Sequence, residues 1–189
     1  MRTTKYFSAI LIFTLNLLFS QMTDCKTGKS EYVDQITVDK DDLICLSKNS
    51  DKQNTVFFTF ASWCKPCRIH LPDAIKLEKV NNVDVYVLLV DVEDGDRIKK
   101  TINYVRSIDA DVKIVVLKNS VYGNSLYKRN KKFVEAITPK NMEAIDDFSK
   151  FILISKNGDV KYVTNWKDYD KDWENSQSML NKKIIPLLE

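Results

Sequence analysis

The chain has 189 residues, of which 44% are hydrophobic and 29% are charged, values that exclude a disordered or fibrous protein. The net charge of +3, from 29 basic and 26 acidic residues, gives no electrostatic footprint for nucleic acid. A single histidine excludes a His-rich metal centre, and the length allows a core that does not depend on disulfides.

The N-terminal segment has the pattern of a targeting sequence. Arg2 and Lys5 precede the apolar run Tyr6–Phe19, in which Asn16 is the only strongly polar residue. The run is too short for a comfortable membrane span, which needs about 20 apolar residues. Residues 1–20 are therefore predicted to be a secretory signal peptide, with an uncleaved anchor or a buried helix as the alternatives. Export would place the cysteines in an oxidising compartment.

Lipidation of Cys25 is a second route to the membrane. Asp24 stands where a bacterial lipobox has a small residue, so simple secretion is favoured over a lipoprotein. Contact with a membrane is thus expected only if the N-terminal segment or a lipidated Cys25 anchors the chain. Residues 21–31 are polar and predicted to be a flexible lead-in, and residues 32–189 are predicted to form one domain.

Strand and helix patterns alternate along that domain. Thr55–Ala61 is a continuous apolar run, which predicts a central strand buried on both faces. The other predicted strands cover residues 32–38, 43–47, 83–90, 112–117, 151–155 and 160–163. The predicted helices cover residues 66–80, 94–108, 124–137 and 170–189. This order predicts an α/β fold with a central mixed β-sheet flanked by helices, to which short N-terminal strands are added.

A pair of cysteines stands where the central strand ends and a helix begins. Two residues separate Cys64 from Cys67, so their sulfurs can close a disulfide across the first helical turn. Cys64 is placed at the helix N-terminus, where free N–H groups, the helix dipole and the charge of Lys65 favour its thiolate. Cys67 lies one turn further on, shielded, and able to attack a mixed disulfide formed by Cys64. Pro66 is tolerated there because N–H groups of the first turn have no intrahelical acceptor.

Two other interpretations of the cysteine pair are a structural disulfide and half of a zinc site. A structural zinc ion needs four ligands, whereas Cys25 and Cys45 are isolated and His70 is the only imidazole. No metal is therefore predicted. A C-x-x-C motif between a strand and a helix favours redox chemistry of the thioredoxin type.

The sixteen-residue segment 57–72, FFTFASWCKPCRIHLP, resembles the active site of thioredoxin-like proteins. It is most similar to exported bacterial thiol–disulfide oxidoreductases of the TlpA/ResA type, in which F-x-A-x-W-C-x-P-C runs into C-R-x-x-x-P. The matching positions are Phe60, Ala61, Trp63, Cys64, Pro66, Cys67, Arg68 and Pro72. The segment 151–162, FILISKNGDVKY, resembles a later strand–turn–strand of that family.

The resemblance implies a thioredoxin-like fold and an enzyme that exchanges disulfides with protein substrates. Cys64 would be the nucleophile and Cys67 the resolving thiol, with no cofactor beyond this disulfide. The implied partners are protein disulfides or dithiols and a thiol electron donor or acceptor, and neither nucleic acid nor metal. The implied location is the periplasm or cell envelope of a bacterium.

Three positions depart from the family. Phe58 replaces a buried Asp of cytoplasmic thioredoxins that assists proton transfer. His70 stands where the exported branch often has a Glu; it is expected to tune the cysteine pair without being essential, and the alternative is a partly exposed helix-surface histidine with no role. Ser149 occupies the position of a cis-proline that faces the cysteines. The Phe148–Ser149 peptide is therefore expected to be trans, with the Ser149 hydroxyl in reach of Cys64.

Two rival functions are weighed against disulfide exchange. A thiol peroxidase of this fold needs a proline and a Ser or Thr where Phe57 and Ala61 stand, so it is disfavoured. A non-enzymatic thioredoxin-like binding module of the cell envelope, with a relict C-x-x-C, is the alternative that the missing cis-proline supports.

The remaining candidate residues are given structural roles. Cys45 is expected to be a buried inert thiol, although a disulfide with Cys25 is open after export. Trp166 and Trp173 are expected to pack the C-terminal helix. The acidic residues after the second buried strand are expected to cap the following helix, namely Asp91, Glu93, Asp94 and Asp96.

Overall fold

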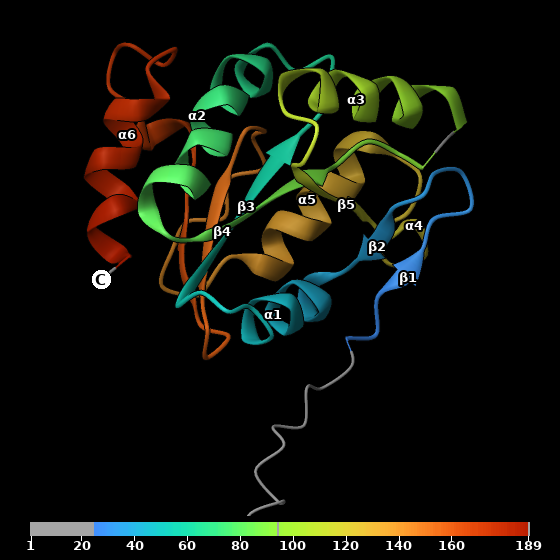
Figure 1. Ribbon diagram of the computed structural model, residues 1–189, viewed down its shortest axis with the longest axis horizontal. Coiled ribbons are helices and arrows are strands. Elements are labelled where there is room, and N and C mark those ends of the chain that lie inside the picture. The colour runs from blue at the N-terminus through green and yellow to red at the C-terminus, as the bar shows by residue number, and fades with distance from the viewer. Residues whose placement is uncertain (1–24, 94, 189) are drawn as a thin grey trace, which may run out of the picture.

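A seven-stranded mixed β-sheet forms the centre of the molecule in the computed structural model, which describes residues 25–93 and 95–188 (Figure 1). The strand order is β1-β2-β5-β4-β3-β6-β7. The strands β2, β5, β4 and β3 run parallel, while β1, β6 and β7 are joined to them antiparallel. The strands are β1 (Gly28–Lys29), β2 (Ile36–Val38), β3 (Asn54–Phe60), β4 (Asp84–Leu89), β5 (Lys113–Leu117), β6 (Phe151–Ser155) and β7 (Val160–Val163).

Helices cover both faces of the sheet (Figure 1). The helices α1 and α5 lie on one face of the sheet, and α2 and α3 lie on the other. A short helix α4 follows β5, and α6 packs beside α2. The helices are α1 (Lys40–Lys48), α2 (Lys65–Asn81), α3 (Gly95–Ile108), α4 (Asn119–Tyr122), α5 (Leu126–Ile137) and α6 (Ser176–Lys183). The predicted fold class, a mixed sheet flanked by helices, is confirmed.

The central strand β3 is buried along its whole length, as its apolar run predicts. It pairs with β4 on one side and with β6 on the other, so its carboxyl end is held in the middle of the sheet. The helix α2 starts five residues after β3 ends. The cysteine pair therefore lies at the end of a strand that is buried and paired on both sides.

The strand predicted over residues 43–47 is wrong, because these residues belong to α1. The Asp39 carboxylate accepts hydrogen bonds from the N–H groups of Asp41 and Asp42, at 2.9 and 3.1 Å. The Asp42 carboxylate in turn accepts from the N–H of Asp39 at 2.9 Å. This reciprocal capping box starts a helix at the acidic residues that suggest a turn in the sequence.

Two short strands precede α1 in the N-terminal part of the domain. The predicted strand 32–38 is reduced to Ile36–Val38, and the lead-in predicted to be flexible contributes β1. A disulfide joins Cys25 to Cys45 on α1, so the expectation of an inert thiol at Cys45 is wrong and the open alternative holds. The predicted signal peptide over residues 1–20 lies outside the described residues.

The C-terminal helix predicted over residues 170–189 begins later. The Asn175 side chain accepts from the N–H of Ser178 at 3.0 Å and starts α6 at Ser176. Two 3-10 helices, Trp166–Asp168 and Ile185–Leu187, flank it. The residues between β7 and α6 consequently form an irregular segment, 164–175, which contains the first of these 3-10 helices and contributes residues to the surroundings of Cys64. None of the helices that the structure describes is long and apolar enough to cross a membrane.

Candidate active site

Cys64 and Cys67 form a disulfide at the start of α2, with their Cα atoms 5.2 Å apart. Cys64 is the N-cap residue of the helix, and its sulfur accepts a hydrogen bond from the Cys67 N–H at 3.2 Å. Cys64 retains 5% of its surface exposed, whereas Cys67 is fully buried. The helix start therefore offers one sulfur to an incoming molecule and keeps the other behind it.

Trp63, directly before the pair, is held by a buried carboxylate. Its indole N–H donates to Asp91 Oδ1 at 2.9 Å, and the Thr101 hydroxyl donates to Asp91 Oδ2 at 3.0 Å. The Trp63 ring meets Phe148 edge-on at 4.8 Å between centroids. Asp91 is fully buried, and its carboxylate links Trp63 to Thr101 of α3, a role beyond the helix capping that the sequence suggests. Its position two residues after β4 could have indicated this contact, because the carboxyl ends of the neighbouring parallel strands β3 and β4 lie at the same edge of the sheet.

We expect Asp91→Leu to destabilise the protein by about 1–3 kcal/mol, because the Trp63 indole N–H would lose the hydrogen-bond acceptor that Asp91 Oδ1 provides. Urea unfolding followed by circular dichroism measures this loss. Thr101→Val is the matched control, since it removes one hydrogen bond to Asp91 but leaves the one from Trp63. A Leu variant as stable as the wild type would show that Asp91 does not hold Trp63.

Lys65, which was expected to lie beside the Cys64 thiolate, contacts two residues of the segment 164–175 with its ammonium group. Its ammonium forms an ion pair with Glu174 at 3.2 Å and lies 5.1 Å from the centre of the Trp173 ring. Both partners of the ion pair are more than half exposed, so the pair itself contributes little to stability. Pro66 occupies the first turn of α2, as predicted.

His70 is buried, with 2% of its surface exposed, so the reading of a partly exposed surface histidine is wrong. Its Nε2 lies 2.8 Å from the Trp173 carbonyl, which only accepts, so this nitrogen carries the proton. In the neutral ring Nδ1 then accepts from the Ser149 hydroxyl, also at 2.8 Å. The ring stacks on Tyr169 at 5.0 Å and 13°. His70 thus joins α2 to two other segments of the chain.

Burial lowers the pKa of His70 below its ordinary value of 6.5, against smaller opposing effects of the Trp173 carbonyl and the Asp73 charge. At pH values between this lowered pKa and 6.5, the imidazole is therefore largely protonated in the unfolded chain and largely neutral in the folded chain. We expect the free energy of unfolding to be unaffected by this group above pH 7. It should fall as the pH drops below 6.5, by at most about 1.4 kcal/mol per pH unit.

Because His70 is the only histidine, its pKa can be read directly from the single imidazole signal in an NMR titration. His70→Gln is the matched variant, and its stability should fall less between pH 7 and pH 5.5 than that of the wild type. A titration midpoint at or above 6.5 would contradict the burial of the ring.

Ser149 lies opposite the cysteines in a left-handed conformation, with φ at +66°. The Phe148–Ser149 peptide is trans, as predicted, and the described residues contain no cis peptide bond. The hydroxyl of Ser149 pairs with His70, so the expected contact with Cys64 is replaced by this one. The next residue, Lys150, fixes the loop to β3, since its N–H donates to Thr59 Oγ1 at 2.8 Å and its carbonyl accepts from the Thr59 N–H at 2.9 Å.

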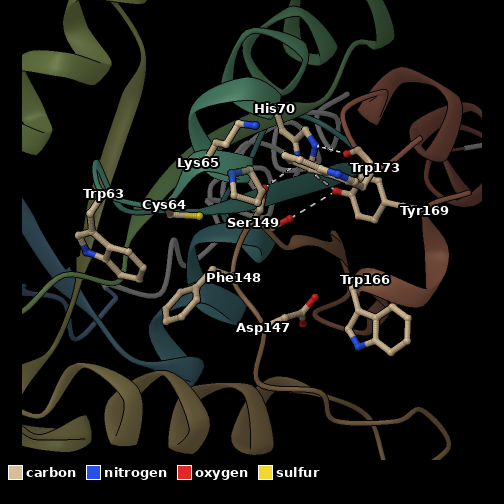
Figure 2. Close-up of a pocket in the computed structure, with 11 residues that line it drawn as sticks. Trp63, Cys64, Lys65, His70, Asp147, Phe148, Ser149, Trp166, Tyr169 and Trp173 are labelled. Carbon is tan, nitrogen blue, oxygen red and sulfur yellow. Dashed lines mark hydrogen bonds between the residues drawn. The ribbon is translucent and has the colours of Figure 1, made fainter. Parts of the chain in front are cut away.

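A cavity of about 400 Å³ opens beside Cys64, and Figure 2 shows aromatic side chains from three parts of the chain around it. Six of its lining residues are among the predicted site residues, namely Trp63, Cys64, Lys65, Pro66, His70 and Ser149. The others were not predicted as site residues, namely Asp147, Phe148, Trp166, Tyr169 and Trp173. Trp166 and Trp173 therefore line the site, and the expectation that they pack the C-terminal helix is wrong.

The comparisons with known proteins agree with this architecture. No family model matches the chain. Thioredoxin 2 of Plasmodium berghei is 27% identical over 84 residues, which cover 43% of this chain. The matched region spans about half the length of that protein (48%).

Among solved structures, a thioredoxin-like protein in its oxidised form aligns with 80% of this chain and 84% of its own, at a TM-score of 0.50 and 14% identity. The thioredoxin domain of a thiol–disulfide oxidoreductase from Bacteroides vulgatus aligns with 67% of this chain and 77% of its own, at a TM-score of 0.44 and 16% identity. The fold of this chain is thioredoxin-like, as the resemblance in the sequence implies.

Proposed function

We propose that this thioredoxin-like chain is a thiol–disulfide oxidoreductase that exchanges disulfides with protein substrates through Cys64 and Cys67. One observation carries the proposal: the cysteine disulfide caps a helix N-terminus, with the Cys64 sulfur on the wall of a cavity and Cys67 sealed behind it. A structural disulfide has no need of this asymmetry. Disulfide exchange requires this asymmetry. One sulfur must be accessible to the substrate, and the other must be shielded until it attacks the mixed disulfide.

In the reducing direction, the Cys64 thiolate attacks one sulfur of the substrate disulfide. A bond forms between these two sulfurs, and the second substrate sulfur leaves as a thiolate that takes up a proton. The Cys67 thiol then loses its proton and attacks Cys64, which closes the Cys64–Cys67 disulfide and releases the first substrate sulfur as a thiol. Two electrons pass from the enzyme dithiol to the substrate, and the same steps run backwards when a substrate dithiol is oxidised.

The N-terminal N–H groups of α2 stabilise the Cys64 thiolate in both directions. The Cys67 N–H already donates to that sulfur in the oxidised state, and the helix dipole adds its positive end. The cysteine pair is itself the redox group in this proposal, so it needs no added cofactor. A small thiol or a partner dithiol restores the reduced form.

Export to the periplasm or cell envelope of a bacterium is part of the proposal. The targeting pattern of residues 1–20 supports it, and so does the Cys25–Cys45 disulfide, because disulfides persist in oxidising compartments. That disulfide also disfavours lipidation, since it occupies the sulfur to which a lipid would be attached.

Reduction of insulin by dithiothreitol, followed by the turbidity of the released B chain, tests the activity. We expect the protein to accelerate the reaction at catalytic concentration. The non-enzymatic binding module predicts that the rate stays at the level of dithiothreitol alone, with or without the protein. That result would overturn the proposed function.

A further inference from the structure

Beside Cys64 lies a cavity whose walls are unusually aromatic. Trp63, Trp166 and Trp173 line it, and 40%, 62% and 39% of their respective surfaces are exposed to solvent. Tyr169 and Phe148 complete the ring around the opening (Figure 2). Large aromatic side chains left in contact with water around one opening mark a binding surface, since their burial is the main source of affinity at protein interfaces.

The segment 164–175 supplies three of the eleven residues that line this cavity, Trp166, Tyr169 and Trp173. It reaches the site because His70 holds the Trp173 carbonyl through Nε2 and stacks on Tyr169. The Lys65 ammonium adds a second attachment, to Glu174 and to the ring of Trp173. The two contacts of the buried His70 hold the segment as a preformed wall, and the exposed contacts of Lys65 add little to them.

The charges at the rim of the cavity are already paired. Lys65 has Glu174 as its partner, and the Asp147 carboxylate forms an ion pair with the buried ammonium of Lys150. A charged side chain entering the cavity would therefore find both ionic lining residues, Lys65 and Asp147, already ion-paired and would lose its hydration. An uncharged apolar side chain would lose nothing and would cover the exposed rings.

We infer that this cavity binds an apolar, preferably aromatic, side chain of the substrate polypeptide next to the cysteine that Cys64 attacks. The inference rests on the proposed function, because exchange brings the substrate sulfur to Cys64 and thereby places the flanking residues of the substrate against Trp63 and the segment 164–175. The segment is then a selectivity element, and it favours substrates with a hydrophobic residue beside their disulfide.

Short disulfide-linked peptides that differ only in the residue before the cysteine test the selectivity. The residue is Phe, Leu, Ala, Lys or Asp, and the reduced protein is supplied with dithiothreitol. We expect kcat/KM for the Phe peptide to exceed that for the Ala peptide by about tenfold, as a filled apolar pocket gives. The Lys and Asp peptides should react no faster than the Ala peptide.

Trp166→Ala is the sharpest variant, because this side chain is exposed and its loss leaves the core intact. In this variant, the ratio of kcat/KM for the Phe peptide to kcat/KM for the Ala peptide should fall to about one. Tyr32→Ala, which removes an exposed aromatic side chain outside the cavity, is the matched control and should keep the wild-type ratio. Trp166→Phe should retain most of the wild-type selectivity for the Phe peptide.

The reduction of bis(2-hydroxyethyl) disulfide separates the two proposals, because this small molecule cannot fill the cavity. If it is reduced but the five peptides react equally, or if Trp166→Ala keeps the wild-type ratio, the selectivity inference is overturned and the proposed function stands. If neither it nor any peptide is reduced, both fail. A dimer that dissociates in Trp166→Ala would also overturn the inference, since the cavity would then be an interface between copies of this chain.

Discussion

Cys64→Ser is expected to abolish insulin reduction, and Cys67→Ser is expected to accumulate stable mixed disulfides with protein substrates. Cys64 is the sulfur that reaches the cavity, so without it no bond to the substrate forms. Cys67 is fully buried and attacks only Cys64, so without it the first bond forms and persists. Non-reducing electrophoresis of each reduced variant, after incubation with a disulfide-bonded protein substrate, shows the difference directly.

Graded alkylation of the reduced protein is the companion measurement. Iodoacetamide at pH 5 to 9, followed by mass spectrometry of the labelled peptides, should label Cys64 at lower pH than Cys67, because Cys64 caps the helix N-terminus. Preferential labelling of Cys67, or mixed disulfides that accumulate in Cys64→Ser, would reverse the two roles.

Removing the second disulfide is expected to have the largest effect on stability. Cys25 and Cys45 are 20 residues apart, and their bond ties the start of the described chain to α1. In the chain-entropy description, a closed loop of this size stabilises the folded state by about 3 kcal/mol. The double variant Cys25→Ala/Cys45→Ala should lose that amount in urea unfolding of the oxidised protein.

The matched control is the same comparison in excess reductant. The wild type and the double variant should then unfold at similar urea concentrations, because the bond is open in both. A variant that is as stable as the oxidised wild type would show that the bond does not constrain the unfolded chain. Activity should remain, since Cys64 and Cys67 are untouched.

Much of the fold could be predicted because the strong signals are local. The apolar run that became β3 and the two periodic helices that follow it, α2 and α3, were located to within one residue at each end. Errors occur where polar side chains decide the conformation. The Asp39–Asp42 capping box turned an expected strand into α1, and the Asn175 cap shortened the last helix. Such hydrogen bonds leave little trace in a hydrophobic pattern.

The candidate site divides in the same way. The cysteine pair and its neighbours could be found because they are adjacent in the sequence. The hydrogen bond between Trp63 and Asp91 joins residues 28 positions apart in the sequence. The hydrogen bond between His70 and Ser149 joins residues 79 positions apart. Trp166 and Trp173 belong to no recognisable motif, and the prediction of a C-terminal helix led to the expectation that they pack against it. Only the folded chain shows that the segment 164–175 passes beside Cys64.

The reduction potential of the Cys64–Cys67 pair tests the central claim most directly. The oxidised protein is equilibrated with glutathione buffers of graded ratio, and each cysteine is quantified by alkylation and mass spectrometry. We expect Cys64 and Cys67 to be reduced together at a potential between about −270 and −120 mV, as in redox enzymes of this fold, while Cys25–Cys45 stays closed until below about −300 mV. A Cys64–Cys67 bond that resists reduction as strongly as Cys25–Cys45 would be a structural one and would contradict the proposed exchange.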